Sequence, residues 1–61
     1  MHKFFYNGVQ IGNYDTYEQM SRSLTDAIAH APTKGKHVTV KTEWDDHGYA
    51  TAHLRVEDTN D

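Results

Sequence analysis

The chain contains no cysteine, and this absence excludes several kinds of site at once. Neither a disulfide nor a zinc centre built from thiolates can form, and no cysteine nucleophile is present. The absence fits a reducing compartment. The sequence also lacks internal repeats, low-complexity tracts and linkers, so a single domain covering residues 1–61 is expected.

Basic residues are outnumbered, and long apolar runs are missing. Lys and Arg total six against nine Asp and Glu, which gives a net charge of -3. Proteins that bind nucleic acid or anionic membranes generally carry a basic excess, because phosphate neutralisation supplies much of their affinity. The first residues lack the apolar core of a signal peptide, and no run approaches the length of a transmembrane helix. We therefore expect a cytoplasmic protein that does not bind a membrane, and a nucleic acid is a less favoured partner than a protein.

The small size limits the hydrophobic core. A domain of 61 residues buries roughly 60% of the surface that its unfolded chain exposes, so its stability is marginal. Many such domains fold alone, and others gain stability from a metal or a partner subunit.

The segment from Thr16 to Ala31 has the clearest helical periodicity. Its apolar residues recur at steps of three, four and seven, which places them on one stripe of a helix. They are Tyr17, Met20, Leu24, Ala27, Ile28 and Ala31. Thr16 with Gln19 matches a capping box, and Asp15 with Glu18 offers the same device one residue earlier. The proline that follows Ala31 ends the helix.

A hairpin is predicted around Asn7-Gly8, because both residues tolerate the positive φ of a type I′ turn. With that turn, Tyr6 pairs with Val9. Phe4 then pairs with Ile11, and all four side chains face the core. The opposite face is predicted to carry Lys3, Phe5, Gln10 and Gly12.

A second hairpin is predicted from two alternating segments, 37–44 and 49–57. A connecting loop of two or four residues would place the two apolar rows on opposite faces. A loop of three, 46–48, places both rows on one face and provides Gly48 for its left-handed last position. The predicted pairs on the core face are Trp44 with Ala50, Val40 with Leu54 and Val38 with Val56. Those on the outer face are Lys41 with His53, Thr39 with Arg55 and His37 with Glu57.

These elements predict an α+β fold of order ββαββ, a four-stranded antiparallel sheet with one helix packed on one face. We predict that the first strand lies between the second and the third, with the fourth at the edge. This order makes every pair of neighbours antiparallel. The polar residues Asp58–Asp61 are expected to form a frayed tail.

The topology places the helix start and the last hairpin turn at the same end of the sheet. There we predict a partner-binding surface of Tyr14, Asp15, Glu18, Glu43, Asp45, Asp46 and Tyr49, next to Tyr17 and Trp44. The opposite end should carry Asn7, His30, Lys34, Lys36 and His37. Tyr and Trp are common interface anchors, and surrounding acids attract a basic partner. Alternatively, the acids only cap the helix and form the turn, and Tyr17 and Trp44 belong to the core.

Other kinds of site receive less support from the sequence. The five histidines include no pair at the helical spacing of four residues, so we predict no metal site and no cofactor. Asp45 and Asp46 lie in an exposed turn, and so small a domain has little room for a substrate pocket, so we do not expect an enzyme. Phe5 on the outer face could stack on a base, but it is a single aromatic in mixed charge.

We therefore expect a small acidic protein–protein interaction module that binds a protein with a basic surface. Small acidic domains with one helix on a short sheet are frequent among phage and mobile-element proteins. Such proteins often act as inhibitors that bind and block a host nucleic-acid enzyme, an analogy of size and layout. The alternative is a small nucleic-acid-binding or antitoxin-like regulatory module that forms a homodimer through its sheet. The edges of the sheet also allow strand addition to a partner.

Overall fold

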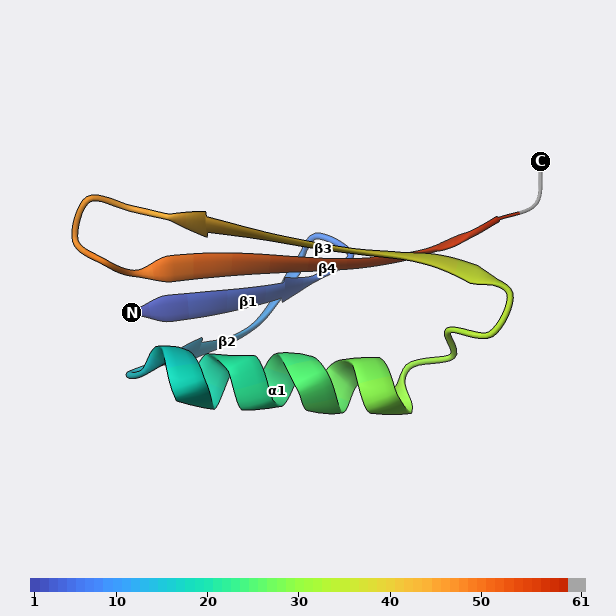
Figure 1. The fold of residues 1–61 in the computed structure, drawn as a ribbon, viewed down its shortest axis with the longest axis horizontal. Coiled ribbons are helices and arrows are strands. Elements are labelled where there is room, and N and C mark those ends of the chain that lie inside the picture. The colour runs from blue at the N-terminus through green and yellow to red at the C-terminus, as the bar shows by residue number, and fades with distance from the viewer. Residues whose placement is uncertain (60–61) are drawn as a thin grey trace.

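Five elements make up the computed structural model, which describes residues 1–59. They are β1 (His2–Tyr6), β2 (Val9–Tyr14), α1 (Tyr17–His30), β3 (Lys36–Trp44) and β4 (Ala50–Asp58). The strands form one sheet in the order β2-β1-β4-β3, and α1 packs against β1, β2 and β4 (Figure 1). The predicted ββαββ order is confirmed. No helix within residues 1–59 is long and apolar enough to cross a membrane.

Helix α1 has the predicted cap. The Thr16 side-chain oxygen accepts a hydrogen bond from the Gln19 backbone N–H at 3.2 Å, and the Gln19 side chain accepts one from the Thr16 N–H at 3.4 Å. This reciprocal pair is a capping box that begins at Thr16, and not at Asp15. At the other end, Ala31 is extended, as expected for a residue before proline.

The hairpin of β3 and β4 also has the predicted register. Val40 lies opposite Leu54, and all six predicted cross-strand pairs are present. Gly48 has φ +83° and donates its N–H to the Asp45 carbonyl at 3.2 Å, which closes the three-residue loop. The two apolar rows therefore share one face of the sheet, the face toward α1, which we call the inner face.

The prediction of a purely antiparallel sheet is wrong, because β4 and not β3 lies beside β1. The pair β1–β4 is parallel, with Phe4 opposite Ala52 and Tyr6 opposite Leu54. Side-chain size explains the order. The inner face of β4 begins with Ala50 and Ala52, which leave room for a helix to approach, whereas β3 carries bulkier residues there.

The side chain of Asn7 extends the parallel pair beyond β1. Asn7 has φ +47°, so the main chain turns away into β2. Its own N–H donates to the Leu54 carbonyl at 2.8 Å. Its side-chain amide then accepts from the Val56 N–H at 2.8 Å and donates to the Val56 carbonyl at 3.2 Å. Asn7 thus forms the type I′ turn and provides the hydrogen bonds that one further strand residue would make.

The register of β1 with β2 differs from the prediction. Phe4 lies opposite Gly12, and a β-bulge leaves Ile11 as an extra residue that is 54% exposed. Tyr6 does pair with Val9, but Val9 lies on an edge strand and is exposed. Gly12 is therefore on the inner face, where a Cβ would lie 2.9 Å from the Tyr14 hydroxyl. The glycine makes room for the Tyr14 ring. Because Ile11 is the extra residue of the bulge, Gly12 and Tyr14 both lie on the inner face.

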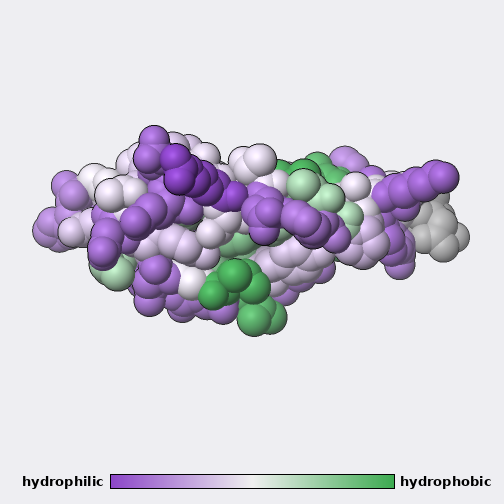
Figure 2. Space-filling view, turned by 90° about the horizontal axis from the view of Figure 1, so that it is seen from below, coloured by the Kyte–Doolittle hydropathy of each residue, from purple (hydrophilic) through white to green (hydrophobic). Residues whose placement is uncertain are grey.

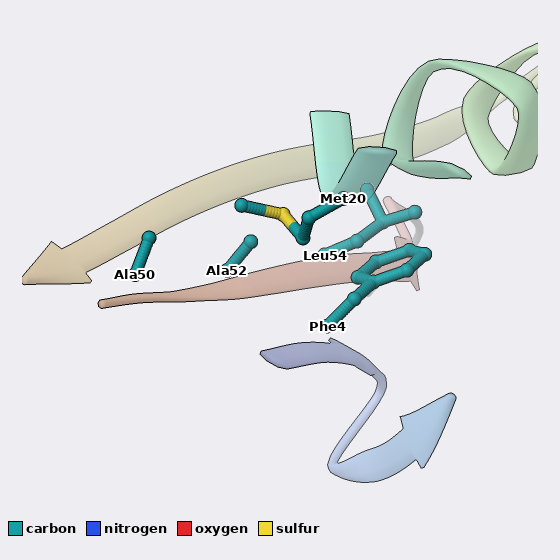
Figure 3. Close-up of a cluster of buried hydrophobic side chains, with 5 residues drawn as sticks. All are labelled: Phe4, Met20, Ala50, Ala52 and Leu54. Carbon is teal, nitrogen blue, oxygen red and sulfur yellow. The ribbon is translucent and has the colours of Figure 1, made fainter. Parts of the chain in front are cut away.

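The core is small. Its fully buried side chains come from β1, α1 and β4 (Figure 3), and they are Phe4, Met20, Ala50, Ala52 and Leu54. Apolar residues of both edge strands remain exposed, and hydrophobic residues reach the surface in two separate places on the face seen in Figure 2. On β3 these include Val38 and Val40, although both lie on the inner face.

The prediction of a frayed tail from Asp58 onward is wrong for its first two residues. Asp58 is the last residue of β4 and forms an ion pair with Lys36. The Thr59 hydroxyl donates to the Gly35 carbonyl at 2.9 Å. The rest of the predicted tail, residues 60–61, lies outside the described residues.

The role of Asn7 is testable, because glycine tolerates the same backbone conformation but lacks the amide. Asn7→Gly should lower the free energy of unfolding by about 1–2 kcal/mol, the value of two exposed hydrogen bonds. Asn7→Asp keeps the acceptor for the Val56 N–H, so its free energy of unfolding should lie between that of the parent and that of Asn7→Gly. Urea unfolding measures all three proteins, and a glycine variant as stable as the parent would contradict this role.

Candidate partner-binding surface

Four aromatic rings lie together at one end of the sheet, where β1 and β4 begin, β3 ends and α1 begins. The ring centroids of Tyr17 and Trp44 are 5.1 Å apart, and that of His2 is 5.4 Å from Tyr49. The His2 ring also contacts Tyr17 and Trp44 edge-on, at 6.1 and 6.2 Å. We call these four residues the aromatic cluster. Trp44 is 57% exposed and Tyr17 is also exposed, so their interpretation as core residues is wrong.

His2 holds the cluster together, and sequence reasoning missed it. It is only 7% exposed, and its Nδ1 accepts a hydrogen bond from the Ala50 N–H at 3.0 Å. A ring nitrogen that accepts must be unprotonated, so the proton of the neutral ring lies on Nε2. The signal was the period of two along β1, since His2, Phe4 and Tyr6 alternate onto one face.

The turn after Trp44 is built by the carboxylate of Asp45. This carboxylate accepts hydrogen bonds from the backbone N–H groups of Tyr49 at 2.9 Å and of His47 at 2.8 Å. Chiefly because of the bond from Tyr49, the pKa of the Asp45 carboxyl is lowered from its usual value. Asp45 therefore stays charged beside the aromatic cluster and supports the loop that carries Tyr49.

Three further predicted acids lie at this end and are exposed: Asp15, Glu18 and Asp46. Glu18 lies 3.9 Å from Arg22, but both side chains are 80% exposed, so the pair contributes little. Within residues 1–59, Asp15 and Asp46 form no ion pair. We call Asp15, Glu18, Asp45 and Asp46 the acidic group.

The other two predicted residues lie at this end but belong neither to the aromatic cluster nor to the acidic group. Tyr14 packs partly buried against the core and above Gly12, so it supports the sheet. Glu43 lies on the outer face, where its carboxylate is 3.8 Å from His53 and 4.0 Å from Lys41. The alternation of β3 already places Glu43 on the face opposite Trp44, and being next in sequence does not bring the two side chains together.

The opposite end of the molecule carries the predicted cations, but two of them have acidic neighbours. Lys36 pairs with Asp58, and His30 Nδ1 lies 3.3 Å from the Asp26 carboxylate. Lys34 and His37 are exposed there. Glu57 and Asp58 lie at the same end, opposite His37 and Lys36, and balance the two lysines. The charge of the molecule is therefore uneven along its long axis because of the acidic group, and the opposite end is close to neutral.

On the outer face, Phe5 stacks against His53 with ring centroids 5.2 Å apart. The two residues lie opposite each other in the parallel pair β1–β4. The surface beside them mixes both signs of charge, and it is formed by Thr39, Lys41, Glu43, His53, Arg55 and Glu57. One side of the Phe5 ring thus already has a stacking partner within the chain.

The described residues offer no metal site, and the hollow along the helix is not enclosed. No group of three or more His, Asp or Glu side chains that could hold a metal ion occurs in the described part of the chain. A hollow along α1 is open and lined by residues of that helix alone. No protein-family model, curated protein or solved structure matches the chain. The aromatic cluster and the acidic group are therefore the features of the molecule that point to a function.

The structural role of His2 can be tested with His2→Phe, which keeps a ring but removes the acceptor. Because Ala50 is fully buried, its N–H would lose the hydrogen bond to the His2 ring, and the free energy of unfolding should fall by about 1–3 kcal/mol. Tyr49→Phe removes a polar atom from an exposed ring of the same cluster and should change stability by about 0.5 kcal/mol or less. Equal effects of the two substitutions would contradict the role.

The turn predicts a pH dependence. Because the pKa of Asp45 is lowered in the folded state, its stabilising effect is complete above the unfolded-state pKa of about 3.9. The effect is lost as the pH falls through the lower folded-state pKa. Urea unfolding between about pH 2 and about pH 6 should show a shallower loss of stability for Asp45→Asn than for the parent.

Asp46→Asn is the matched control for this prediction. It removes the same charge one residue later, where the carboxylate makes no hydrogen bond within residues 1–59. Its pH dependence should remain closer to that of the parent. If Asp45→Asn lost stability in acid as steeply as the parent, the turn would not be the origin of the effect.

Proposed function

We propose that this protein is a small protein–protein interaction module that binds a basic partner surface through the aromatic cluster and the acidic group. The observation that carries the proposal is the position of Trp44. It is the single tryptophan of the chain, yet it lies outside the core and more than half exposed. Large aromatic side chains gain most from burial, and at interfaces they are the usual anchors of binding energy.

Support comes from the rigidity of the cluster. Trp44 is the last residue of β3, Tyr49 directly precedes β4, and Tyr17 is the first residue of α1. All three contact the buried His2 ring. The capping box fixes the helix start, and Asp45 fixes the turn. Anchors that are already ordered lose little entropy on binding.

The sign of the partner's charge is inferred from the acidic group. Its members come from both sides of the aromatic cluster, two at the helix start and two in the turn. The only cation paired to them in the described part of the chain is Arg22. Acids around aromatic anchors increase the association rate of a basic partner, and the effect weakens with salt.

By analogy of size and layout with small phage and mobile-element proteins, we further propose that the partner is a host protein such as a nucleic-acid enzyme. Such enzymes present basic surfaces to their substrates, and an acidic, aromatic surface can occupy them. Binding there would block the enzyme, so the module would act as an inhibitor.

The alternative of nucleic-acid binding is favoured less by the outer face. Phe5 stacks on His53, and Glu43 and Glu57 interrupt the cations Lys41 and Arg55. Surfaces that bind single strands combine free aromatic faces with a basic groove. A titration with DNA and RNA at several salt concentrations separates the two functions, since salt-dependent binding there would favour the alternative.

The proposal predicts the effect of reversing charges on both sides of the aromatic cluster. Glu18→Lys with Asp46→Lys should weaken partner binding about tenfold or more while leaving the circular dichroism spectrum unchanged. Affinity capture from cell lysate identifies partners, and titration then measures their affinity for each variant. Asp45 is left intact, because its carboxylate builds the turn.

Asp26→Lys with Glu57→Lys is the control, since it makes the same change in net charge away from the acidic group. Partners that bind the control but not the Glu18 and Asp46 variant support the proposed surface. Partners that bind both variants equally, or that lose both equally, would contradict it.

A further inference from the structure

Strand β3 forms one edge of the sheet, on the side away from α1 (Figure 1). The loop between β3 and β4 shows which backbone groups of β3 point toward β4 and which point toward the open edge. The Asp45 N–H donates to the Tyr49 carbonyl, so Asp45 and every second residue before it direct their backbone groups toward β4. The hydrogen bonds of Leu54 and Val56 with Asn7 agree, because they show that even-numbered residues of β4 point toward β1.

The even-numbered residues of β3 therefore present their backbone N–H and C=O groups at the edge. They are Val38, Val40, Thr42 and Trp44, together with Lys36, whose N–H already donates to the Thr33 carbonyl. The same residues form the inner-face row of β3, where Val40 is 44% exposed because α1 does not reach this strand. A nine-residue edge with an exposed apolar row is a template for strand pairing, and β3 carries neither a proline nor a bulge to prevent it.

We propose that β3 pairs antiparallel with β3 of a second copy, about a two-fold axis at Thr42, and so joins two sheets into one of eight strands. In this register Thr42 lies opposite Thr42 of the second copy. Val40 lies opposite Trp44 on the inner face, and Lys41 lies opposite Glu43 on the outer face. Because the axis is two-fold, each of these two pairs occurs twice in the dimer.

Charge complementarity selects this register over its neighbours. An axis at Lys41 would place two lysines opposite each other, and an axis at Glu43 would do the same with two glutamates; both are destabilising. The axis at Thr42 instead forms two Lys–Glu pairs, a threonine pair and two aromatic–β-branched pairs, which are all favourable across strands. The even-numbered groups at the edge then form the hydrogen bonds between copies.

The charges at the two ends of the molecule agree with the same arrangement. Antiparallel pairing places the turn of one copy beside the start of β3 in the other, so that Asp46 lies opposite Val38. The acidic turn thus comes next to His37 of the second copy and to its Lys36, which also pairs with Asp58 of its own chain. This inference goes beyond the proposed partner surface and is argued from the β3 edge. The two surfaces share Trp44 and Asp46, whereas Asp15, Glu18, Tyr17 and Tyr49 lie outside β3.

The register is tested by exchanging charges. Lys41→Glu would oppose two glutamates twice in the dimer, and Glu43→Lys would oppose two lysines twice. Each single variant should therefore raise the dimer dissociation constant about tenfold or more. An equimolar mixture of the two should dimerise like the parent, because each copy then supplies the charge that the other requires. The double variant Lys41→Glu with Glu43→Lys should also dimerise.

Analytical ultracentrifugation from micromolar to millimolar concentration measures these constants, and circular dichroism checks that each variant folds. Fluorescence of Trp44, the single tryptophan, should shift to shorter wavelength as the dimer forms. Lys3→Glu and Glu57→Lys change the same charges on the outer faces of β1 and β4 and should leave dimerisation unchanged.

Three outcomes would overturn the inference. The parent could remain a monomer at every concentration, in which case the β3 edge is open or binds another partner. The single variants could dimerise as tightly as the parent. Both could be weakened without recovery on mixing, which would indicate a different edge or register.

Discussion

β4 lies between β1 and β3, and its parallel pairing with β1 determines which apolar side chains are buried. β1 has only five residues, whereas β4 has nine. Side chains continue the pairing at both ends of the shorter strand: His2 accepts from the Ala50 N–H, and the Asn7 amide bonds both backbone groups of Val56. The small residues of β4 then lie beneath α1, and β3 is left at the edge of the sheet.

Both proposed surfaces follow from this position of β3. If β3 lay beside β1, α1 could cover its inner face, and Val38, Val40 and Trp44 would belong to the core. At the edge they remain exposed, beyond the reach of α1. Trp44 contacts the aromatic cluster through Tyr17 and also ends the apolar row of β3. In a domain whose fully buried core consists of five side chains, this exposed row is a large share of the apolar surface that a second molecule could cover.

Local chemistry made several features predictable from sequence. The capping box at Thr16, the type I′ turn at Asn7-Gly8 and the loop closed by Gly48 each depend on residues close together in the chain. The register of β3 with β4 followed from combining loop length with alternation. The strand order did not follow, because it depends on which strand packs better beneath the helix, and a preference for antiparallel neighbours outweighed the signal of Ala50 and Ala52. The bulge at Ile11 depends on the fit of the Tyr14 ring over Gly12, which no sequence period indicates.

The position of the acidic group was nevertheless predicted, because exchanging β3 and β4 within the sheet does not change the direction of either strand. The helix brings the chain back along the sheet, so β3 must run toward the helix start, and its turn must lie beside Tyr17 in either order. The direction of each strand determines which side chains lie at that end of the sheet. The order of the strands determines which of these side chains α1 covers. That is why the sequence placed Trp44 at the correct end but left its burial undecided. Edge pairing and partner binding would respond differently to conditions. Burial of the β3 row in a dimer would stabilise the fold by an amount that grows with the logarithm of the protein concentration, by mass action. Attraction of a partner by the acidic group would weaken as salt is added. A protein that used both would show concentration-dependent stability at high salt and partner binding mainly at low salt.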